Sequence, residues 1–269
     1  MARRIAVCNQ KGGVGKTTTS VNLAAALALR SGRALLVDMD PQAHATLGLG
    51  VDRSTLKMSV YEAIVEAQRV EEAILPDRGE RLDLLPGSIN LAGGEVELVE
   101  AEQREFRLQK ALALVAPRYD YIVIDCPPSL GLLTQNSLAA ADGVLVPVQA
   151  EYLALEGISR LLDTINLVRR GVNPALAIEG VLITMYSSRL SLAQQVADEV
   201  RSFFKEQAFE TIIPRSVRLA EAPSFGKTVF GYDPHSAGAQ AYMALADEVI
   251  ARHHPQVVEA AGGDAGEAE

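Results

Sequence analysis

A glycine-rich segment near the N-terminus, Asn9-Gln-Lys-Gly-Gly-Val-Gly-Lys-Thr-Thr18, has the residue types needed to bind phosphate. The standard phosphate-binding loop, G-x-x-x-x-G-K-S/T, requires glycine at position 10, where this chain has Gln10, so the pattern fails at one position. The rest of the pattern, Gly15-Lys16-Thr17, directly follows an apolar run and opens a helical pattern, which is the context that this loop requires. The segment therefore predicts a site for the phosphates of a nucleotide.

The backbone of this loop is expected to approach the phosphates closely. Gly12, Gly13 and Gly15 permit conformations that aim N–H groups at a polyphosphate, and Val14 lies between them. The helical pattern that begins at Lys16 adds the positive end of a helix dipole. The whole stretch from Gly12 to Gly15 is therefore predicted to contact the nucleotide.

Four side chains of the same segment have predicted roles. Lys16 would reach the β- and γ-phosphates, the Thr17 hydroxyl would hold Mg²⁺, and Thr18 would make another phosphate contact. Lys11 cannot easily fold back onto the same phosphates beside Lys16, so we expect it to reach a nucleotide held by another subunit. There it would stabilise charge in the transition state of phosphoryl transfer, as an arginine finger does.

Three aspartates follow apolar runs that are predicted strands. Asp38 and Asp40 come after the run Ala34–Val37, and Asp125 ends the run that begins at Tyr121. Asp125 has the Walker B pattern, whose aspartate binds Mg²⁺ directly or through water. Asp40 would orient or activate the attacking water and Asp38 would assist the metal shell, although either could instead cap a helix or close a turn.

The elements that must position these residues alternate along the chain. The predicted strands are Arg4–Cys8, Ala34–Val37, Leu82–Leu85, Tyr121–Ile124, Gly143–Val148, Ile178–Ile183 and Glu210–Ile213. The predicted helices are 16–30, 59–66, 104–115, 131–140, 153–170, 189–205 and 237–252. This alternation predicts one α/β domain over residues 1–254, a P-loop NTPase with a doubly wound, mostly parallel sheet flanked by helices. Residues 255–269 are rich in Pro, Gly, Ala and acids, which predicts a disordered acidic tail.

Charge and composition exclude several classes of protein. The 25 Lys and Arg residues against 34 Asp and Glu give a net charge of −9, which argues against a generally basic nucleic-acid coat but permits a local basic patch. Two cysteines, Cys8 and Cys126, cannot form a disulfide framework or a four-cysteine metal site, and a reduced cytosolic compartment is expected. No run approaches the roughly 18 apolar residues of a membrane helix, so no membrane partner is expected.

With these motifs in place, the sequence resembles the ParA/MinD group of P-loop ATPases. The segment Lys11–Thr18 matches the deviant Walker A motif of that group, and the resemblance covers about residues 3–252. Asp38-Met-Asp-Pro-Gln42, Asp125-Cys-Pro-Pro-Ser-Leu-Gly131 and Ile213–Gly226 are similar to the Soj-type chromosomal ParA branch. The resemblance implies an ATPase that Mg²⁺ and ATP drive into a sandwich homodimer, which binds double-stranded DNA non-specifically and coats the nucleoid. It also implies a ParB-type centromere-binding partner that stimulates hydrolysis, so that chromosome origins or plasmids are segregated.

The resemblance also assigns roles to matching residues. Asp40 matches the hydrolysis aspartate of the family, and Asp125 matches its Walker B acid. The residues that match phosphate and Mg²⁺ ligands are Lys11, Gly13, Gly15, Lys16, Thr17 and Thr18. The residues that match the region around the adenine are Met185, Pro214, Arg215 and Ser216. Family members often have asparagine where Ser216 stands.

Basic residues in the C-terminal third are the predicted DNA contacts. Arg189 and Arg218 match arginines that contact DNA in Soj-like proteins. A dimer would double such a local patch, and phosphate contacts suffice for binding without sequence preference. Arg218 could instead pair with Glu221 and hold the loop near the nucleotide.

The sequence leaves other functions open. A ParA-like ATPase that positions a non-DNA protein cargo would share these motifs. A MinD-like cell-division ATPase also shares the loop at 9–18 but needs a basic amphipathic C-terminal helix, whereas this C-terminus is acidic and rich in Gly and Ala. A nitrogenase-iron-protein type of cluster carrier would need cluster cysteines, which Cys8 and Cys126 do not provide.

Overall fold

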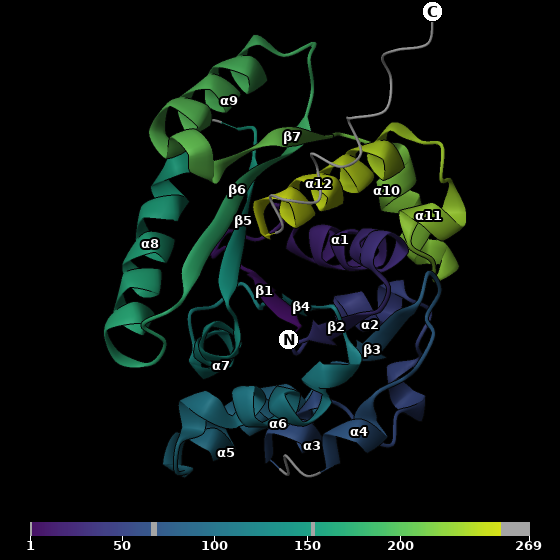
Figure 1. The fold of residues 1–269 in the computed structure, drawn as a ribbon, viewed down its shortest axis with the longest axis vertical. Helices are drawn as coiled ribbons and strands as arrows, with labels where there is room; N and C mark the ends of the chain where they lie inside the picture. The colour runs from purple at the N-terminus through teal and green to yellow at the C-terminus, as the bar shows by residue number, and fades with distance from the viewer. Residues whose placement is uncertain (1, 66–68, 152–153, 254–269) are drawn as a thin grey trace, which may run out of the picture.

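The computed structural model describes residues 2–65, 69–151 and 154–253. At its centre lies one seven-stranded sheet in the order β3-β2-β4-β1-β5-β6-β7, and every neighbouring pair of strands is parallel (Figure 1). The predicted α/β fold class is therefore confirmed. The strands are β1 Arg3–Val7, β2 Ala34–Asp38, β3 Leu82–Leu85, β4 Tyr121–Asp125, β5 Gly143–Gln149, β6 Ala177–Tyr186 and β7 Ala208–Pro214.

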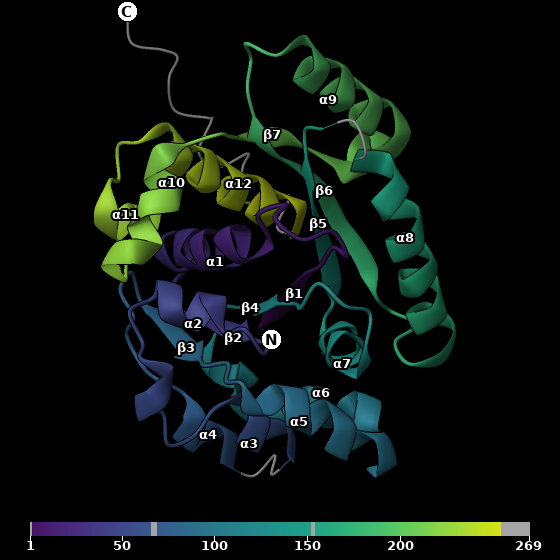
Figure 2. The ribbon, with the colours of Figure 1, turned by 180° about the vertical axis from the view of Figure 1, so that it is seen from behind.

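Helices cover both faces of the sheet, because each parallel connection has to cross from one strand to the next (Figures 1 and 2). On one face α1 packs beside α12, and on the other α6 packs beside α7. The longer helices are α1 Lys16–Ser31, α5 Asn90–Glu97, α6 Arg107–Val115, α7 Leu132–Ala140, α8 Ala154–Gly171, α9 Ser191–Phe204 and α12 Ala237–His253. The shorter helices are α2 His44–Gly48, α3 Val60–Val65, α4 Val70–Ala73, α10 Val217–Glu221 and α11 Val229–Tyr232.

The alternation of side chains along the strands divides the core into two layers. Ile5 and Val7 of β1 belong to the layer beneath α1 and α12, while Ala6 and Cys8 belong to the opposite layer. All four are almost completely buried, as expected for a parallel sheet that is covered on both faces. The second cysteine, Cys126, lies in the same layer as Cys8, so both thiols are part of the core.

All seven predicted strands form; Leu82–Leu85 has the predicted bounds, and the ends of the others shift by up to three residues. The longer predicted helices also form, but the one expected over 104–115 begins with a 3₁₀ turn and becomes α6 only at Arg107. The helix expected over 59–66 forms as α3, with residue 66 outside the described residues. The helices α2, α4, α5, α10 and α11 are not predicted from the sequence; they span four to eight residues and so contain few turns in which a 3.6-residue period can show.

Two further expectations concern the ends of the chain and the membrane. The predicted acidic tail, residues 255–269, lies outside the described residues, so the domain boundary at 254 stays a prediction. Among the helices that the structure describes, none combines the length and the apolar character needed to cross a membrane.

The register of the strands brings the candidate site residues together at the carboxyl ends of the central strands. Asp38 at the end of β2 pairs with Asp125 at the end of β4, and Val7 at the end of β1 is the other neighbour of Asp125. The glycine-rich loop leaves β1 at this same edge and leads directly into α1. The carboxyl edge of a parallel α/β sheet is the usual place for a ligand.

Both outer edges of the sheet are covered by the chain itself. Along β7, the Glu248 carboxylate of α12 accepts the backbone N–H groups of Glu210 at 2.9 Å and Thr211 at 3.1 Å. Arg252 donates to the carbonyl of Ala208 at 3.0 Å on the same strand. Along β3, an isolated antiparallel bridge joins the backbones of Leu75 and Leu84. Several backbone groups on the outer side of both edge strands therefore have partners within the molecule.

Candidate nucleotide-binding site

The glycine-rich loop adopts the conformation that phosphate binding requires. Gly13 has a φ of +75° and Gly15 a φ of +86°, a left-handed conformation that residues with a Cβ rarely adopt. Asn9 fixes the start of the loop, since its Oδ1 accepts the Lys11 N–H at 3.0 Å and its Nδ2 donates to the Pro147 carbonyl at 2.7 Å. The loop is thus held open before any ligand contacts it.

The two loop lysines differ in their surroundings. Lys16 is buried, and its Nζ donates to the backbone carbonyl of Lys11 at 3.1 Å, so its ammonium lies across the glycine-rich loop. Lys11 is only half-buried, next to the exposed Gly12 and Gly13. The position of Lys16 across the loop is compatible with phosphate binding, and the more exposed position of Lys11 is compatible with reaching a second subunit. Both roles stay predictions.

Asp125 has a free oxygen beside the loop. Its Oδ1 accepts a hydrogen bond from Ser20 Oγ at 2.8 Å, while its buried Oδ2 has no hydrogen-bond partner among the described residues. Ser20 lies one turn after Lys16 in α1, so the helix that opens at the loop also holds this carboxylate. An unpartnered buried carboxylate oxygen fits a Mg²⁺ ligand, since Mg²⁺ is a hard cation that prefers oxygen.

Burial raises the pKa of both aspartates at the carboxyl ends of β2 and β4. Burial raises the pKa of Asp125, and the neighbouring Asp38 raises it further, while the Ser20 and Thr17 hydroxyls offset part of the rise. Burial likewise raises the pKa of Asp38, although hydrogen bonds from Thr46 and the backbone of Asp40 oppose it. Bound Mg²⁺ would favour the charged form of Asp125.

Asp38 is held by neighbouring hydrogen-bond donors. Its Oδ2 accepts the Thr46 N–H at 2.8 Å and the Thr46 hydroxyl at 2.7 Å, and its Oδ1 accepts the Asp40 N–H at 3.3 Å. The Thr46 hydroxyl in turn accepts the Gly87 N–H at 2.8 Å. Asp38 therefore joins the ends of β2 and β3 to α2, and its predicted place in the metal shell stays a prediction.

Asp40 lies in the tight turn that follows Asp38. Its Oδ1 accepts the Gln42 N–H at 2.9 Å, and its carbonyl accepts the Ala43 N–H at 2.8 Å. The residue is 9% exposed and its Oδ1 has one backbone donor, so the carboxylate retains the capacity to accept a proton from a water that reaches it. The geometry is compatible with the predicted hydrolytic role of Asp40.

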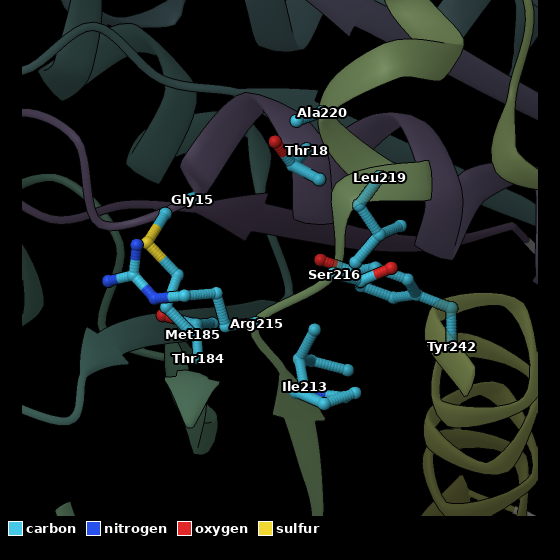
Figure 3. Close-up of a pocket in the computed structure, with 11 residues that line it drawn as sticks. Gly15, Thr18, Thr184, Met185, Ile213, Arg215, Ser216, Leu219, Ala220 and Tyr242 are labelled. Carbon is cyan, nitrogen blue, oxygen red and sulfur yellow. The ribbon is translucent and has the colours of Figure 1, made fainter. Parts of the chain in front are cut away.

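A cavity of about 210 Å³ adjoins the loop on the side of β6 and β7. Figure 3 shows Met185 and Arg215 on one side of it and Ser216, Leu219 and Tyr242 on the other. The predicted residues that line it are Gly15, Thr18, Met185, Pro214, Arg215 and Ser216. The other lining residues are Thr184, Ile213, Leu219, Ala220 and Tyr242. Its mixed apolar and polar lining, next to a phosphate loop, suits the base and sugar of a nucleotide.

Several residues of the site have no clear signal in the sequence. Thr184 donates from its hydroxyl to the Val14 carbonyl at 2.8 Å and thus joins β6 to the loop. Tyr242 lies in α12, far along the chain, and its hydroxyl is 3.1 Å from that of Thr19. Ser20 could have been found, because it stands four residues after Lys16 and so on the same helix face.

The two predicted DNA contacts lie beyond the carboxyl ends of adjacent strands. Arg189 is exposed in the turn after β6, and Arg218 is in α10 after β7. Arg218 forms ion pairs with Glu221 at 3.0 Å and Asp233 at 3.2 Å, so the pairing with Glu221 that the sequence left open is present. No structural contact tests the DNA roles, which stay predictions.

Comparison with known proteins finds similar sequences over more than 90% of the chain. A family model described as an AAA domain matches residues 2–178. The chromosome partitioning protein ParA of Myxococcus xanthus is 53% identical over 256 residues, covering 95% of this chain and 90% of that protein. The sporulation initiation inhibitor protein Soj of Bacillus subtilis is 53% identical over 251 residues, covering 93% of this chain and 99% of that protein.

Solved structures show the same fold. A cobyrinic acid a,c-diamide synthase from Mycobacterium smegmatis, with bound ADP and magnesium, has a TM-score of 0.83 and 39% identity, covering 96% of this chain and 97% of that one. The cell division ATPase MinD of Pyrococcus furiosus has a TM-score of 0.73 and 28% identity, covering 93% of this chain and 99% of that one. With its phosphate loop, its Walker B aspartate and close relatives over nearly the whole length, this chain belongs to the ParA/Soj family of chromosome-partitioning ATPases.

Proposed function

We propose that this ATPase uses Mg²⁺ and ATP to form a homodimer that binds double-stranded DNA without sequence preference, and that hydrolysis releases it. The observation that supports this most directly is the free, buried Oδ2 of Asp125 beside the glycine-rich loop. A Mg-nucleotide would satisfy that oxygen, and the cavity lined by Met185 and Ser216 would take the base. The magnesium and ADP bound to the Mycobacterium smegmatis relative agree with this assignment.

The residues of the loop bind and orient the phosphates. Backbone N–H groups from Gly12 to Gly15 and the start of α1 would face the phosphate oxygens, with Lys16 among them. Thr17 and Asp125 would hold Mg²⁺, with Asp38 assisting, and Thr18 would add a phosphate contact. When bound, the metal neutralises charge on the phosphates.

Hydrolysis would use groups on the rim of the same edge. Asp40 would orient the attacking water and take its proton, since its carboxylate lies in a turn that leaves it access to solvent. Lys11 would extend to the nucleotide of the second subunit and stabilise charge there. Such a shared site would make the dimer depend on ATP.

DNA binding would be a property of a local surface. Arg189 and Arg218 lie beyond the neighbouring strands β6 and β7, so a dimer would present two copies of this basic edge. Contacts to phosphates would be enough for non-specific binding despite a net charge of −9. We place the protein in the cytoplasm, associated with the nucleoid.

The relatives suggest the biological setting. Proteins named chromosome partitioning protein ParA and Soj are about half identical to this chain. We propose that a ParB-type centromere-binding protein is the partner that stimulates hydrolysis, and that the cycle segregates chromosome origins or plasmids.

Binding to random-sequence duplex DNA, with ATP, with ADP and without nucleotide, tests this function at two salt concentrations. Binding that requires ATP and weakens steeply with salt is the expected result, because phosphate contacts release counterions. ATP-dependent dimerisation without DNA binding in any state would contradict the DNA function. It would favour a ParA-like ATPase that positions a protein cargo.

A further inference from the structure

A compact junction connects the Asp40 turn to the segment that contains Arg218. On one side, α2 is fixed to the sheet edge, because both the N–H and the hydroxyl of Thr46 donate to Asp38. The turn between Asp38 and α2 is short and internally bonded through Asp40 and Ala43. A shift of the Asp40 turn would therefore move α2 with it.

On its other side, α2 meets the 3₁₀ turn Ala222–Phe225, which continues α10. A Cβ at Gly48 would lie 3.5 Å from the Cβ of Pro223. A Cβ at Gly226 would lie only 2.8 Å from the Cα of Gly50, and both glycines have positive φ. Here backbone packs on backbone, with no flexible side chain between them to absorb a displacement.

The same 3₁₀ turn supports the groups that surround Arg218. Phe225 stacks on Tyr232 with ring centroids 4.9 Å apart, and the Tyr232 hydroxyl donates to Glu221 at 3.0 Å. Glu221 and Asp233 pair with the Arg218 guanidinium, which also lies over the Tyr232 ring. These two carboxylates compete with DNA phosphate for the arginine, so their positions affect how much of its charge is available.

We propose that the contact between α2 and the Ala222–Phe225 turn transmits changes at the nucleotide to the ion pairs of Arg218, and so sets its affinity for DNA. The inference rests on the proposed function and adds a physical connection between its two sites. It assigns a transmitting role to Gly48, Gly50, Pro223 and Gly226.

A reversible covalent lock tests the connection. The 3.5 Å between the Cβ positions of residues 48 and 223 is within the range of a disulfide, so Gly48→Cys and Pro223→Cys together can close one. The background chain has Cys8→Ala and Cys126→Ala, which removes the only two native thiols. Affinity for random duplex DNA is measured with Mg-ATP and with Mg-ADP, before and after reduction.

The reduced double variant is expected to bind DNA about tenfold more tightly with Mg-ATP than with Mg-ADP, and the oxidised form to lose that difference. A fluorescent ATP analogue should bind both forms equally if the lock acts only on the connection. Neither position lines the cavity between the loop and β6 and β7, although both line a smaller one beside Thr17 and Thr18, so this binding is measured as a control. The two single-cysteine variants, oxidised in the same way, are the matched controls and should keep the difference. An oxidised double variant that keeps the full difference overturns the proposal.

Failure of DNA binding itself would be a separate result. If the reduced protein shows no nucleotide-dependent DNA binding, the proposed function fails, and hydrogen–deuterium exchange of residues 217–227 decides the connection. Mg-ATP should then change the exchange of this segment in the reduced form and not in the oxidised form. Equal changes in both forms, or no change in either, overturn the connection.

Discussion

The two buried carboxylates at the carboxyl ends of β2 and β4 differ in their hydrogen-bond partners. Asp38 and Asp125 are register neighbours, and burial raises the pKa of each. Asp38 obtains compensation from Thr46 and Asp40, whereas one oxygen of Asp125 obtains none from the described residues. The difference assigns Asp38 chiefly to holding α2 and leaves Asp125 as the stronger candidate for a cation.

Lys16→Ala should abolish nucleotide binding. Its buried ammonium lies across the glycine-rich loop, and its removal leaves the phosphate charge without the nearest cation. We expect ATPase activity to fall by about 100-fold or more, together with binding of a fluorescent ATP analogue. Lys205→Ala, at an exposed position after α9, is the control and should behave like the unmodified protein. ATP-driven dimerisation at full strength in the Lys16 variant would refute the role of the loop.

Asp40→Ala should separate binding from hydrolysis. Asp40 does not line the cavity proposed for the base, so ATP affinity should change little. Turnover should fall by about 100-fold or more through loss of the general base, and the protein should remain on DNA. Steady-state phosphate release and DNA dissociation after ATP removal measure the two effects. Normal turnover in this variant would exclude Asp40 from the chemistry.

At the scale of elements, the side chain of Glu179 connects β6, β1 and α12 near the amino ends of the strands. It lies in β6, its side chain is 1% exposed, and it pairs with Arg3 of β1 at 2.9 Å and with the ring of His253 in α12. Burial alone would raise its pKa, but the hydrogen bonds from His253 and Arg3 outweigh burial and hold the pKa below the ordinary 4.5. Folding is therefore favoured while Glu179 is ionised.

Glu179→Gln should destabilise the protein by about 3 kcal/mol at pH 7, since it breaks a buried ion pair. Because the pKa of Glu179 is lower in the folded state, its contribution is complete above pH 4.5 and is lost as the pH falls through the folded value. Urea unfolding at pH 7 and at successively lower pH should show the difference from the unmodified protein shrinking. Glu206→Gln, exposed nearby, should cost less than about 0.5 kcal/mol at any of these pH values. A difference that grows with acid would contradict this account.

The sequence predicts an element best where its apolar residues form a run or a periodic pattern. It predicts a site residue best where that residue belongs to a motif near a strand end. The seven strands are predictable as apolar runs. Asp125 ends one of them, and Lys16 opens the helix that follows the glycine-rich loop after another. The short α2 and α10 have no period to detect, and Thr46, which binds Asp38, shows its role only once α2 is folded back on the sheet. Tyr242 reaches the cavity because α12 packs on α1, a tertiary contact that no local pattern encodes.

At the scale of the whole molecule, a net charge of −9 opposes DNA, so any affinity must come from the placement of a few cations. Arg189 and Arg218 lie on one edge, while Arg201 is turned to the strand β7 and donates to the Glu210 carbonyl at 3.2 Å. Basic residues that are close in sequence thus do not share one function in space.

Arg189→Ala combined with Arg218→Ala should weaken DNA binding in the ATP state without preventing dimerisation. For every DNA phosphate that the variant no longer neutralises, the slope of log affinity against log salt should become shallower by about 0.9. Arg69→Ala is a matched control, because Arg69 is exposed and forms an i,i+3 ion pair with Glu72 as Arg218 does with Glu221. Fluorescence anisotropy on random duplex DNA over a salt series measures both slopes. An unchanged slope in the double variant would place the DNA surface elsewhere.

The occupied edge strands restrict how two copies can associate. Glu248 and Arg252 already bind the backbone of Ala208, Glu210 and Thr211 in β7, and Leu75 bridges to Leu84 in β3, so these positions are not available to a second sheet. This coverage opposes the side-by-side extension of one continuous sheet, a mode of growth that would have no natural end. Two copies of the chain would instead associate through loops and helices, where contacts can be limited to two subunits and can dissociate. The proposed cycle of dimerisation and release needs that kind of contact, and the covered positions on both borders oppose growth into a fibre.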